Sequence, residues 1–174
     1  RFLDEIDLGG NPDVFAIKDD YLFTFQDFRT LYVVDVANPA ALSVATSSTI
    51  TYGDNVTDVL IEGDHLYATV GGATDALFTY DISNPTAPRQ VSTTTMGSLG
   101  GFNDPHKLAS DGDYLYVITF QSSGLEVFDI TDPAVPQPIA GYANDGTNYL
   151  FGFVNEMRRY GDYLYFINKG GPQS

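Results

Sequence analysis

The sequence predicts an all-β protein, a β-propeller of four-stranded antiparallel blades, because two short phrases recur along the chain. The first, Asp followed by Tyr or His, Leu and a second aromatic residue, occurs at Asp20–Phe23, Asp64–Tyr67, Asp113–Tyr116 and Asp162–Tyr165. The second, which ends in Asn-Pro or Asp-Pro, occurs at Asp35–Pro39, Asp81–Pro85 and Asp129–Pro133. A repeat of roughly 40–50 residues made of short β segments is typical of one propeller blade per repeat.

Each repeat divides into four strands. In the second repeat we expect them at Val56–Ile61, His65–Val70, Ala76–Ile82 and Arg89–Thr95. These segments are rich in β-branched and aromatic residues, whereas Gly, Asp, Asn and Pro fill the gaps between them. Proline has no N–H for a strand ladder, so Pro39, Pro85 and Pro133 must lie outside the paired segments. No window has a sustained helical period, and we expect almost no helix.

The phase of the repeats predicts that both ends of the chain lie inside incomplete blades. We expect a partial propeller with these segments: the last strand of a preceding blade at 1–10, whole blades at 13–50, 55–96 and 104–143, and the first half of a blade at 154–174. Such an arrangement leaves a sheet edge and an apolar blade face open. The expected partners are therefore further blades or neighbouring subunits.

The repeated polar residues have a structural explanation. Gly-Asp in the first hairpin supplies a positive φ and a short side chain that bonds to its own backbone. The Asp that opens the second phrase is expected to accept backbone N–H bonds in the turn after the third strand. Every repeat has these aspartates, which favours a structural role over a catalytic one.

The third repeat carries the strongest family resemblance, in Gly112–Val117 and Gly124–Pro136. Its Gly-Asp-aromatic turn, Gly-Leu step, Asp-Ile-Thr-Asp-Pro phrase and second proline resemble the LVIVD-repeat family of bacterial and archaeal surface propellers. The second repeat departs from the pattern at Asp75–Leu77, and the first has Asp19-Asp20 in place of Gly-Asp. The resemblance implies an extracellular or cell-surface location more than it implies an activity.

The net charge of −15, from 23 acidic and 8 basic residues, limits the possible partners. Nucleic acid needs a basic surface, so a nucleic-acid partner is excluded, and anionic membrane surfaces are disfavoured. No apolar stretch is long enough to span a bilayer. The chain contains no cysteine, which excludes disulfides and thiolate metal sites. If a cation is bound, we expect calcium, because carboxylate oxygens suit hard cations.

Candidate site residues are sought where the repeats differ, at the starts of the first strands. These strands line the central channel of a propeller, and His106 stands there as one of two histidines. A metal site at the channel mouth would use His106, Asp58, Asp104 and Glu156 as ligands. The alternative is a solvated polar rim of the channel, and without a second histidine a transition-metal site has little support.

A second candidate lies in the longest departure from the repeat, the segment Asn144–Phe153. Its Tyr149, Phe151 and Phe153 would form an exposed aromatic surface for a protein partner or a glycan. The alternative is a strand buried between blades.

Two functional hypotheses follow. The first is a non-catalytic extracellular or cell-surface propeller that acts as a structural scaffold or as a binding module for protein or polysaccharide. The alternative is a metal-dependent propeller enzyme, a hydrolase or an oxidoreductase, with its site at the channel mouth. No Gly-x-Ser-x-Gly nucleophile elbow and no phosphate-binding glycine loop is present to favour other catalytic classes.

Overall fold

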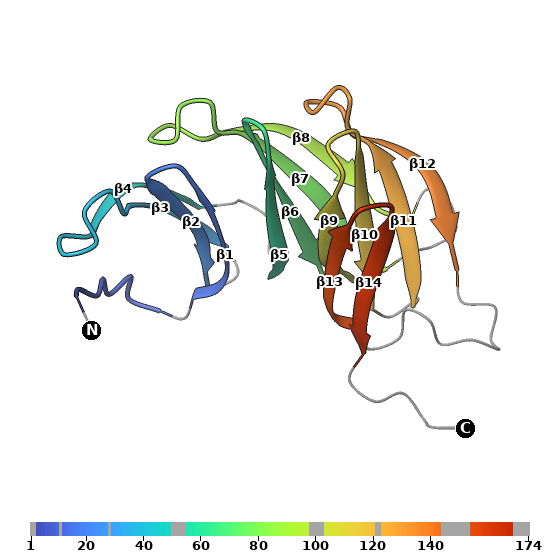
Figure 1. Cartoon of the computed structure of the whole chain (residues 1–174), viewed down its shortest axis with the longest axis horizontal. Coiled ribbons are helices and arrows are strands. Elements are labelled where there is room, and N and C mark those ends of the chain that lie inside the picture. Colours follow the sequence, from blue (N-terminus) through green and yellow to red (C-terminus); the bar gives the residue numbers. More distant parts are fainter. Residues whose placement is uncertain are drawn as a thin grey trace.

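The computed structural model describes residues 3–10, 12–27, 29–49, 55–97, 103–120, 123–143 and 154–168. Within these ranges every regular element is a β-strand, and the strands form three four-stranded sheets and one two-stranded sheet (Figure 1). Each sheet is an antiparallel meander whose strand order follows the chain. The all-β fold class and the partial propeller predicted from the repeats are therefore confirmed.

The strands of each blade are as follows. Blade 1 contains β1 (Pro12–Lys18), β2 (Tyr21–Gln26), β3 (Thr30–Asp35) and β4 (Ser43–Thr49). Blade 2 contains β5 (Asn55–Glu62), β6 (His65–Gly71), β7 (Ala76–Asp81) and β8 (Arg89–Thr95). Blade 3 contains β9 (Pro105–Ser110), β10 (Tyr114–Thr119), β11 (Gly124–Asp129) and β12 (Gln137–Tyr142). Blade 4 contains β13 (Val154–Tyr160) and β14 (Tyr163–Asn168).

The first hairpin of each blade turns on a residue with positive φ. Gly63, Gly112 and Gly161 have φ of 57°, 98° and 59°, and Asp19 takes the same region in blade 1 with φ of 51°. A two-residue hairpin loop needs this left-handed backbone, which glycine adopts without steric cost and Asp tolerates. The Gly-Asp phrase is thus explained by the turn geometry.

The turn after the third strand is held by the aspartate that opens the second phrase. Asp81 Oδ1 accepts hydrogen bonds from the backbone N (3.0 Å) and the hydroxyl (2.7 Å) of Ser83. Asp129 Oδ1 accepts the same pair from Thr131, at 2.9 and 2.7 Å. These bonds hold the pKa of Asp81 down, at about 2. The predicted structural role of these aspartates is confirmed.

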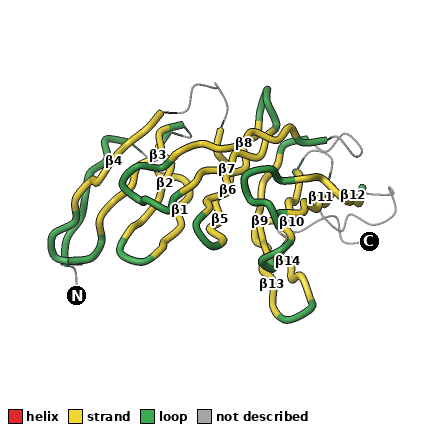
Figure 2. The backbone as a smooth tube through the Cα atoms, turned by 90° about the horizontal axis from the view of Figure 1, so that it is seen from above, coloured by secondary structure: helices red, strands yellow, loops and turns green. Residues whose placement is uncertain are grey.

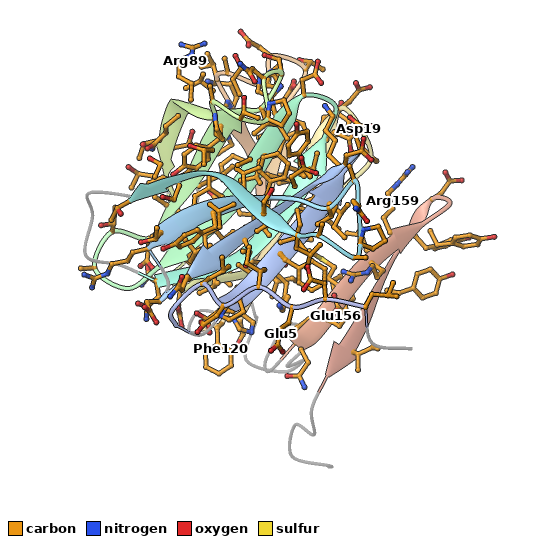
Figure 3. The ribbon with its side chains drawn as sticks, turned by 90° about the vertical axis from the view of Figure 1, so that its left-hand side faces the viewer. Glu5, Asp19, Arg89, Phe120, Glu156 and Arg159 are labelled. Atoms are coloured by element: carbon orange, nitrogen blue, oxygen red, sulfur yellow. The ribbon has the colours of Figure 1, made fainter. Side chains whose placement is uncertain are left out.

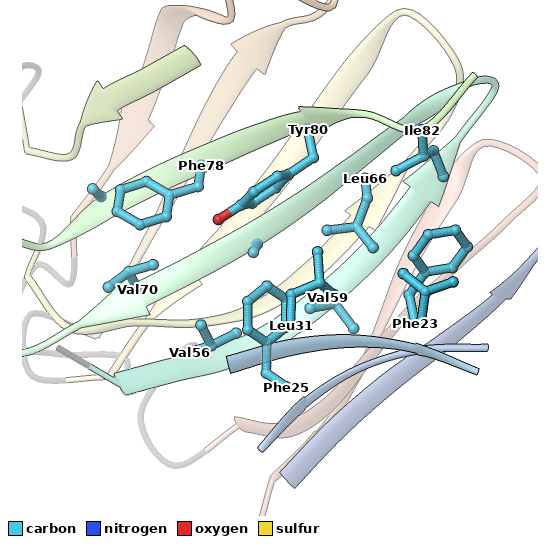
Figure 4. Packing of buried hydrophobic residues seen from close by; sticks show 13 residues of the cluster. Phe23, Phe25, Leu31, Val56, Val59, Leu66, Val70, Phe78, Tyr80 and Ile82 are labelled. Atoms are coloured by element: carbon cyan, nitrogen blue, oxygen red, sulfur yellow. The ribbon is translucent and has the colours of Figure 1, made fainter. Parts of the chain in front are cut away.

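Blades pack face to face through three apolar clusters, one at each junction. Alternation along β6 sends Leu66 toward blade 1 and Tyr67 toward blade 3, so both faces of blade 2 are buried. Figure 4 shows the cluster between blades 1 and 2, where the ring centroid of Phe25 of β2 lies 6.3 Å from that of Tyr80 of β7 and Phe23 lies near Ile82. This stacking of sheets explains why a strand can be buried on both sides.

The inner strands β1, β5, β9 and β13 lie next to one another in that order, as expected for the channel side of a propeller. Seen from above, the blades follow an open arc, with blade 1 at one end and blade 4 at the other (Figure 2). Residues 3–8 form no strand pairing, and Asp4 Oδ2 instead accepts a hydrogen bond from Leu42 N at 2.9 Å. That residues 1–10 complete a preceding blade stays a prediction.

Candidate functional site

The channel side of the arc contains a groove of about 330 Å³ between the inner strands of blades 2, 3 and 4. Its lining comes from Val59 and Leu60 of β5, 108–110 of β9 and 157–159 of β13. The sequence placed the candidate metal ligands at the starts of these strands. Each of the four lies within the described residues, and its contacts can be stated.

Asp58 ties blade 2 to blade 3. Its Oδ2 accepts a hydrogen bond from Leu108 N at 2.9 Å, and its Oδ1 lies 3.8 Å from Lys107 Nζ. Burial raises the pKa of Asp58, although Lys107 and the backbone bonds oppose this effect, and Glu156 adds to the rise. The carboxylate therefore serves as an inter-blade anchor with its own cation beside it.

His106 is half-buried, and its ring packs at a tilt on Phe120, with the ring centroids 5.7 Å apart. Burial, followed by the positive charge of Lys107, lowers the pKa of His106, while Asp104 and Asp58 act in the other direction. The imidazole is thus held as a neutral aromatic partner of Phe120, which lies at the lower edge of the molecule in Figure 3.

Asp104 contributes mainly through its backbone. Its φ is +60°, its N donates to Asp75 Oδ1 at 3.0 Å, and its carbonyl oxygen accepts from Phe120 N at 2.8 Å. A Cβ at Gly71 would lie 2.6 Å from Asp104 Oδ1, so a larger residue at position 71 would displace the Asp104 carboxylate. The loop of blade 2 and the start of β9 are thereby locked together.

Glu156 is paired within its own strand. Its Oε1 accepts hydrogen bonds from Arg158 Nη1 at 2.5 Å and from Met157 N at 3.2 Å. Across the described ranges, no three His, Asp or Glu side chains lie close enough together to hold a metal ion. The four predicted ligands are thus not gathered into such a group, and two of them have cationic neighbours, Lys107 beside Asp58 and Arg158 beside Glu156; metal binding at the channel mouth stays a prediction. Calcium binding elsewhere stays a prediction.

The aromatic surface predicted at Tyr149, Phe151 and Phe153 lies outside the described residues. A different aromatic surface appears on blade 4, which we call the blade 4 end face. It is the face of β13 and β14 turned away from blade 3. Its large exposed apolar and aromatic residues are Tyr160, Tyr163, Tyr165 and Ile167, and exposed Arg158 lies opposite Tyr165 on the same face. The rings of Tyr163 and Tyr165 lie edge to face with centroids 6.5 Å apart.

The sequence contained a signal for this face that the prediction missed. Tyr165 occupies the repeat position of Phe23 and Tyr67, which the next blade covers completely. At the other end of the arc, Phe15 of β1 occupies the repeat position of Val59, and it is likewise exposed. Phe15 and Ile17 form the blade 1 end face. Both end faces thus present residues of the kind that the internal junctions bury.

Glu126 of β11 is a second residue that the prediction missed. It is fully buried at the junction of blades 2 and 3, where its Oε2 accepts a hydrogen bond from Gly97 N at 3.2 Å. Its Oε1 has no partner among the described residues, and burial raises its pKa. The repeat position is Phe78 in blade 2, so comparing the repeats strand by strand would have found it.

Radial four-stranded meanders with their first strands along a common channel define the protein as a β-propeller, open in the part described. The chain belongs to the LVIVD repeat family, whose sequence model matches residues 9–49, 53–95 and 106–144. The resemblance drawn from the third repeat is thereby confirmed. None of the curated proteins matches the chain in sequence.

Solved propellers share the fold at low identity. A candidate 6-phosphogluconolactonase from Bacteroides uniformis aligns with a TM-score of 0.73 and 17% identity, over 92% of this chain and 50% of that one. A candidate 6-phosphogluconolactonase from Bacteroides fragilis aligns with a TM-score of 0.69 and 14% identity, over 82% of this chain and 42% of that one. The periplasmic gluconolactonase PpgL of Pseudomonas aeruginosa aligns with a TM-score of 0.57 and 21% identity, over 79% of this chain and 44% of that one. The chain spans half or less of these proteins' lengths, and the likeness shows the fold alone.

Among the residues described, no helix has the length and apolar character needed to cross a bilayer.

Proposed function

We propose that this chain is a non-catalytic extracellular or cell-surface propeller module that acts as a structural scaffold and binding module, and that its two end faces associate with further blades of the same type. The observation that supports this is the exposure of positions that the internal junctions bury. Further blades of this chain or of a neighbouring subunit would supply the same covering surface. The surface location rests on the family resemblance.

The exposed fractions make the contrast explicit. Tyr165 is 55% exposed, whereas Tyr67 at the same repeat position is 0% exposed. Phe15 is 65% exposed, whereas Val59 is 9% exposed. Covering a large apolar or aromatic side chain contributes about 1.5–3 kcal/mol, so several such residues on one face favour association. A tyrosine-rich face also suits binding of a protein or a polysaccharide, because each ring combines apolar area with a hydroxyl.

The alternative is a metal-dependent enzyme at the channel mouth. Solved structures named gluconolactonases share the fold, which is the observation that favours this alternative. The channel-side contacts favour the structural role instead, since Asp58 and Asp104 are used to join blades 2 and 3.

Sedimentation velocity across a concentration series tests the end-face proposal. We expect reversible association, weakened about tenfold or more by Tyr165→Ser, because the substitution removes the apolar area of one aromatic ring. Tyr142→Ser is the matched control, since Tyr142 is similarly exposed but lies on the outer strand β12 of blade 3. A chain that remains monomeric throughout, or an equal effect of Tyr142→Ser, would contradict the proposal.

A lactone-hydrolysis assay on the same samples tests the enzymatic alternative. We expect no turnover of gluconolactone above the buffer rate, with or without added calcium or zinc. Hydrolysis that is lost in Asp58→Asn would overturn the non-catalytic proposal and favour chemistry at the channel mouth.

A further inference from the structure

Adjacent blades leave a cleft between their hairpin turns, and the molecule provides three versions of it. The largest, about 400 Å³, lies between blades 2 and 3, where the β5–β6, β9–β10 and β11–β12 turns gather at the upper edge of Figure 1. We call it the middle cleft. Its polar and charged lining includes Glu62, Asp64, His65, Tyr67, Asp113 and Thr131.

The cleft between blades 1 and 2 is closed by a cation of the chain itself. Lys18 Nζ, at the end of β1, donates a hydrogen bond to Gly63 O at 2.8 Å and forms an ion pair with Asp64 Oδ1. The space that remains is about 140 Å³. At this junction the buried ring of β2 is Phe23, which has no hydroxyl to satisfy.

The cleft between blades 3 and 4 also contains a cation of the chain. Arg159 Nε of β13 lies 3.9 Å from Asp111 Oδ2. The hydroxyl of Tyr116 donates to the same carboxylate oxygen at 2.8 Å. This cleft measures about 210 Å³. In both sister clefts, therefore, a basic side chain of one blade lies beside a carboxylate of the adjacent blade, from the earlier blade in the first cleft and from the later blade in the second.

The middle cleft departs from this pattern at two equivalent positions. Register places Glu62 where blade 1 has Lys18, because Glu62 pairs with His65 as Lys18 pairs with Tyr21. Carboxylates thus face the cleft from both blades, Glu62 from blade 2 and Asp113 from blade 3, and its lining contains no Lys or Arg. Glu62 Oε2 accepts a hydrogen bond from Ser110 Oγ at 2.6 Å.

The second departure is Tyr67. Its side chain is fully buried, lines the middle cleft, and has a hydroxyl with no hydrogen-bond partner among the described residues. An unpaired buried hydroxyl costs about 1–3 kcal/mol, which a bound ligand would recover. The equivalent hydroxyl of Tyr116 is satisfied by Asp111 of its own blade. The middle cleft therefore combines unbalanced negative charge with an open hydrogen-bonding position.

We propose that the middle cleft binds the ammonium or guanidinium group of a lysine or arginine side chain from a partner protein. The external cation would supply the positive charge that Lys18 and Arg159 bring to the sister clefts from two different repeat positions. Its N–H groups would donate to Glu62 and to the Tyr67 oxygen. A volume of about 400 Å³ lies in the range of small-ligand sites, whereas the two sister clefts fall below it.

A bare metal ion fits this cleft less well than an organic cation does. Among the residues described, no three acidic or histidine side chains are close enough to coordinate one ion. An ammonium or guanidinium group reaches separate acceptors through several N–H donors and does not need a compact ligand set. The proposal deepens the binding role proposed above but involves no end face, so either one can fail without the other.

Titration followed by amide chemical shifts tests the proposal. The probes are a capped glycine-lysine-glycine peptide, its arginine counterpart and 1,5-diaminopentane. We expect saturable shifts around the β5–β6 and β9–β10 turns with both peptides, weakening as salt is added. Glu62→Gln and Tyr67→Phe are each expected to weaken binding by about tenfold, since a hydrogen bond to a charged group is lost. The matched control is Glu5→Gln, an exposed change of the same charge.

A third variant tests the internal analogy. Glu62→Lys should place a cation opposite Asp113, as Lys18 lies opposite Asp64, and we expect it to abolish peptide binding while the chain keeps or raises its melting temperature. Absence of saturable shifts with the peptides, or equal weakening by Glu5→Gln, would overturn the proposal. Binding of 1,5-diaminopentane without binding of either peptide would overturn the proposal of a protein partner. It would indicate instead that the cleft binds a free amine.

Discussion

At the scale of single residues, Glu126 is the described carboxylate with the least contact with water. Its side chain is fully buried at an apolar junction, and it accepts one hydrogen bond, from Gly97 N. An ionised carboxylate in such surroundings loses hydration that a single backbone donor does not replace. Burial therefore raises its pKa above the ordinary value of 4.5.

This raised pKa makes stability depend on pH. The folded chain holds the proton of Glu126 more tightly than the unfolded chain does, so its favourable contribution is complete below pH 4.5 and is lost as the pH rises through the folded-state pKa. Glu126→Gln replaces the carboxyl group with an amide that does not ionise, so this variant does not lose stability through this group as the pH rises. We expect its free energy of unfolding at pH 7 to exceed that of the parent by about 1–2 kcal/mol, with convergence in acid.

Urea unfolding at a series of pH values measures this difference, with Glu5→Gln as the exposed control. A parent chain that is more stable than Glu126→Gln at pH 7 would mean that the ionised carboxylate has a favourable partner.

Residue roles were predictable from the sequence where they depend on local contacts. Asp81 and Asp129 bond to residues two positions ahead, so the repeated phrase alone indicated their turns. Asp58 was expected at the channel mouth, but its pairing with Lys107 and Leu108 depends on how closely blade 3 approaches blade 2. That distance is a property of the stacked sheets, and no local pattern encodes it.

At the scale of elements, the strands were predictable almost residue by residue. The expected segment Arg89–Thr95 is β8, and the expected His65–Val70 is β6 less its last residue. Turn chemistry fixes both ends of each strand, which explains this agreement. The chemistry of each blade face was not foreseen, because alternation shows which residues share a face but not what covers it.

The junction between blades 2 and 3 is more polar than the one before it. Thr69, Thr79 and Glu126 are fully buried there, at repeat positions that carry Phe25, Val33 and Phe78 at the junction of blades 1 and 2. Thr79 Oγ1 has no hydrogen-bond partner in the described part of the chain. The second junction therefore buries polar side chains at three positions where the first has apolar ones, although the first also buries the hydroxyl of Tyr80.

Restoring the residue of blade 1 should stabilise this junction. Thr79→Val keeps the shape of the side chain and removes the buried hydroxyl, so we expect the free energy of unfolding to rise by about 1 kcal/mol. Thr95→Val, an exposed change of the same chemistry on β8, should have a much smaller effect. Chemical denaturation compares the two variants, and a loss of stability in Thr79→Val would reveal an unseen partner of its hydroxyl.

At the scale of the whole molecule, each blade contacts only its neighbours, so stability should vary along the arc. Strands β6, β7, β10 and β11 lie between two apolar clusters, whereas β13 and β14, like the strands of blade 1, pack on one cluster only. We expect backbone amides of β6, β7, β10 and β11 to exchange more slowly than those of β13 and β14.

Hydrogen exchange followed by mass spectrometry measures this gradient. The exchange should be measured at low protein concentration and in the Tyr165→Ser variant, because association through the blade 4 end face would itself protect the amides of β14 from exchange. Uniform protection of all four blades would show that the described part unfolds as a single cooperative unit.

The unequal junctions also bear on how the chain avoids assembling its blades in the wrong order. Repeats of similar shape can exchange partners during folding, because one blade face can dock on another. Blade 3 placed against blade 1 would bring Glu126 against Phe25 and Val33 and would separate it from Gly97 N, its donor at the native junction. A mismatched junction is therefore less stable than the native one. The buried polar residues that weaken one interface thus favour the native order of the blades.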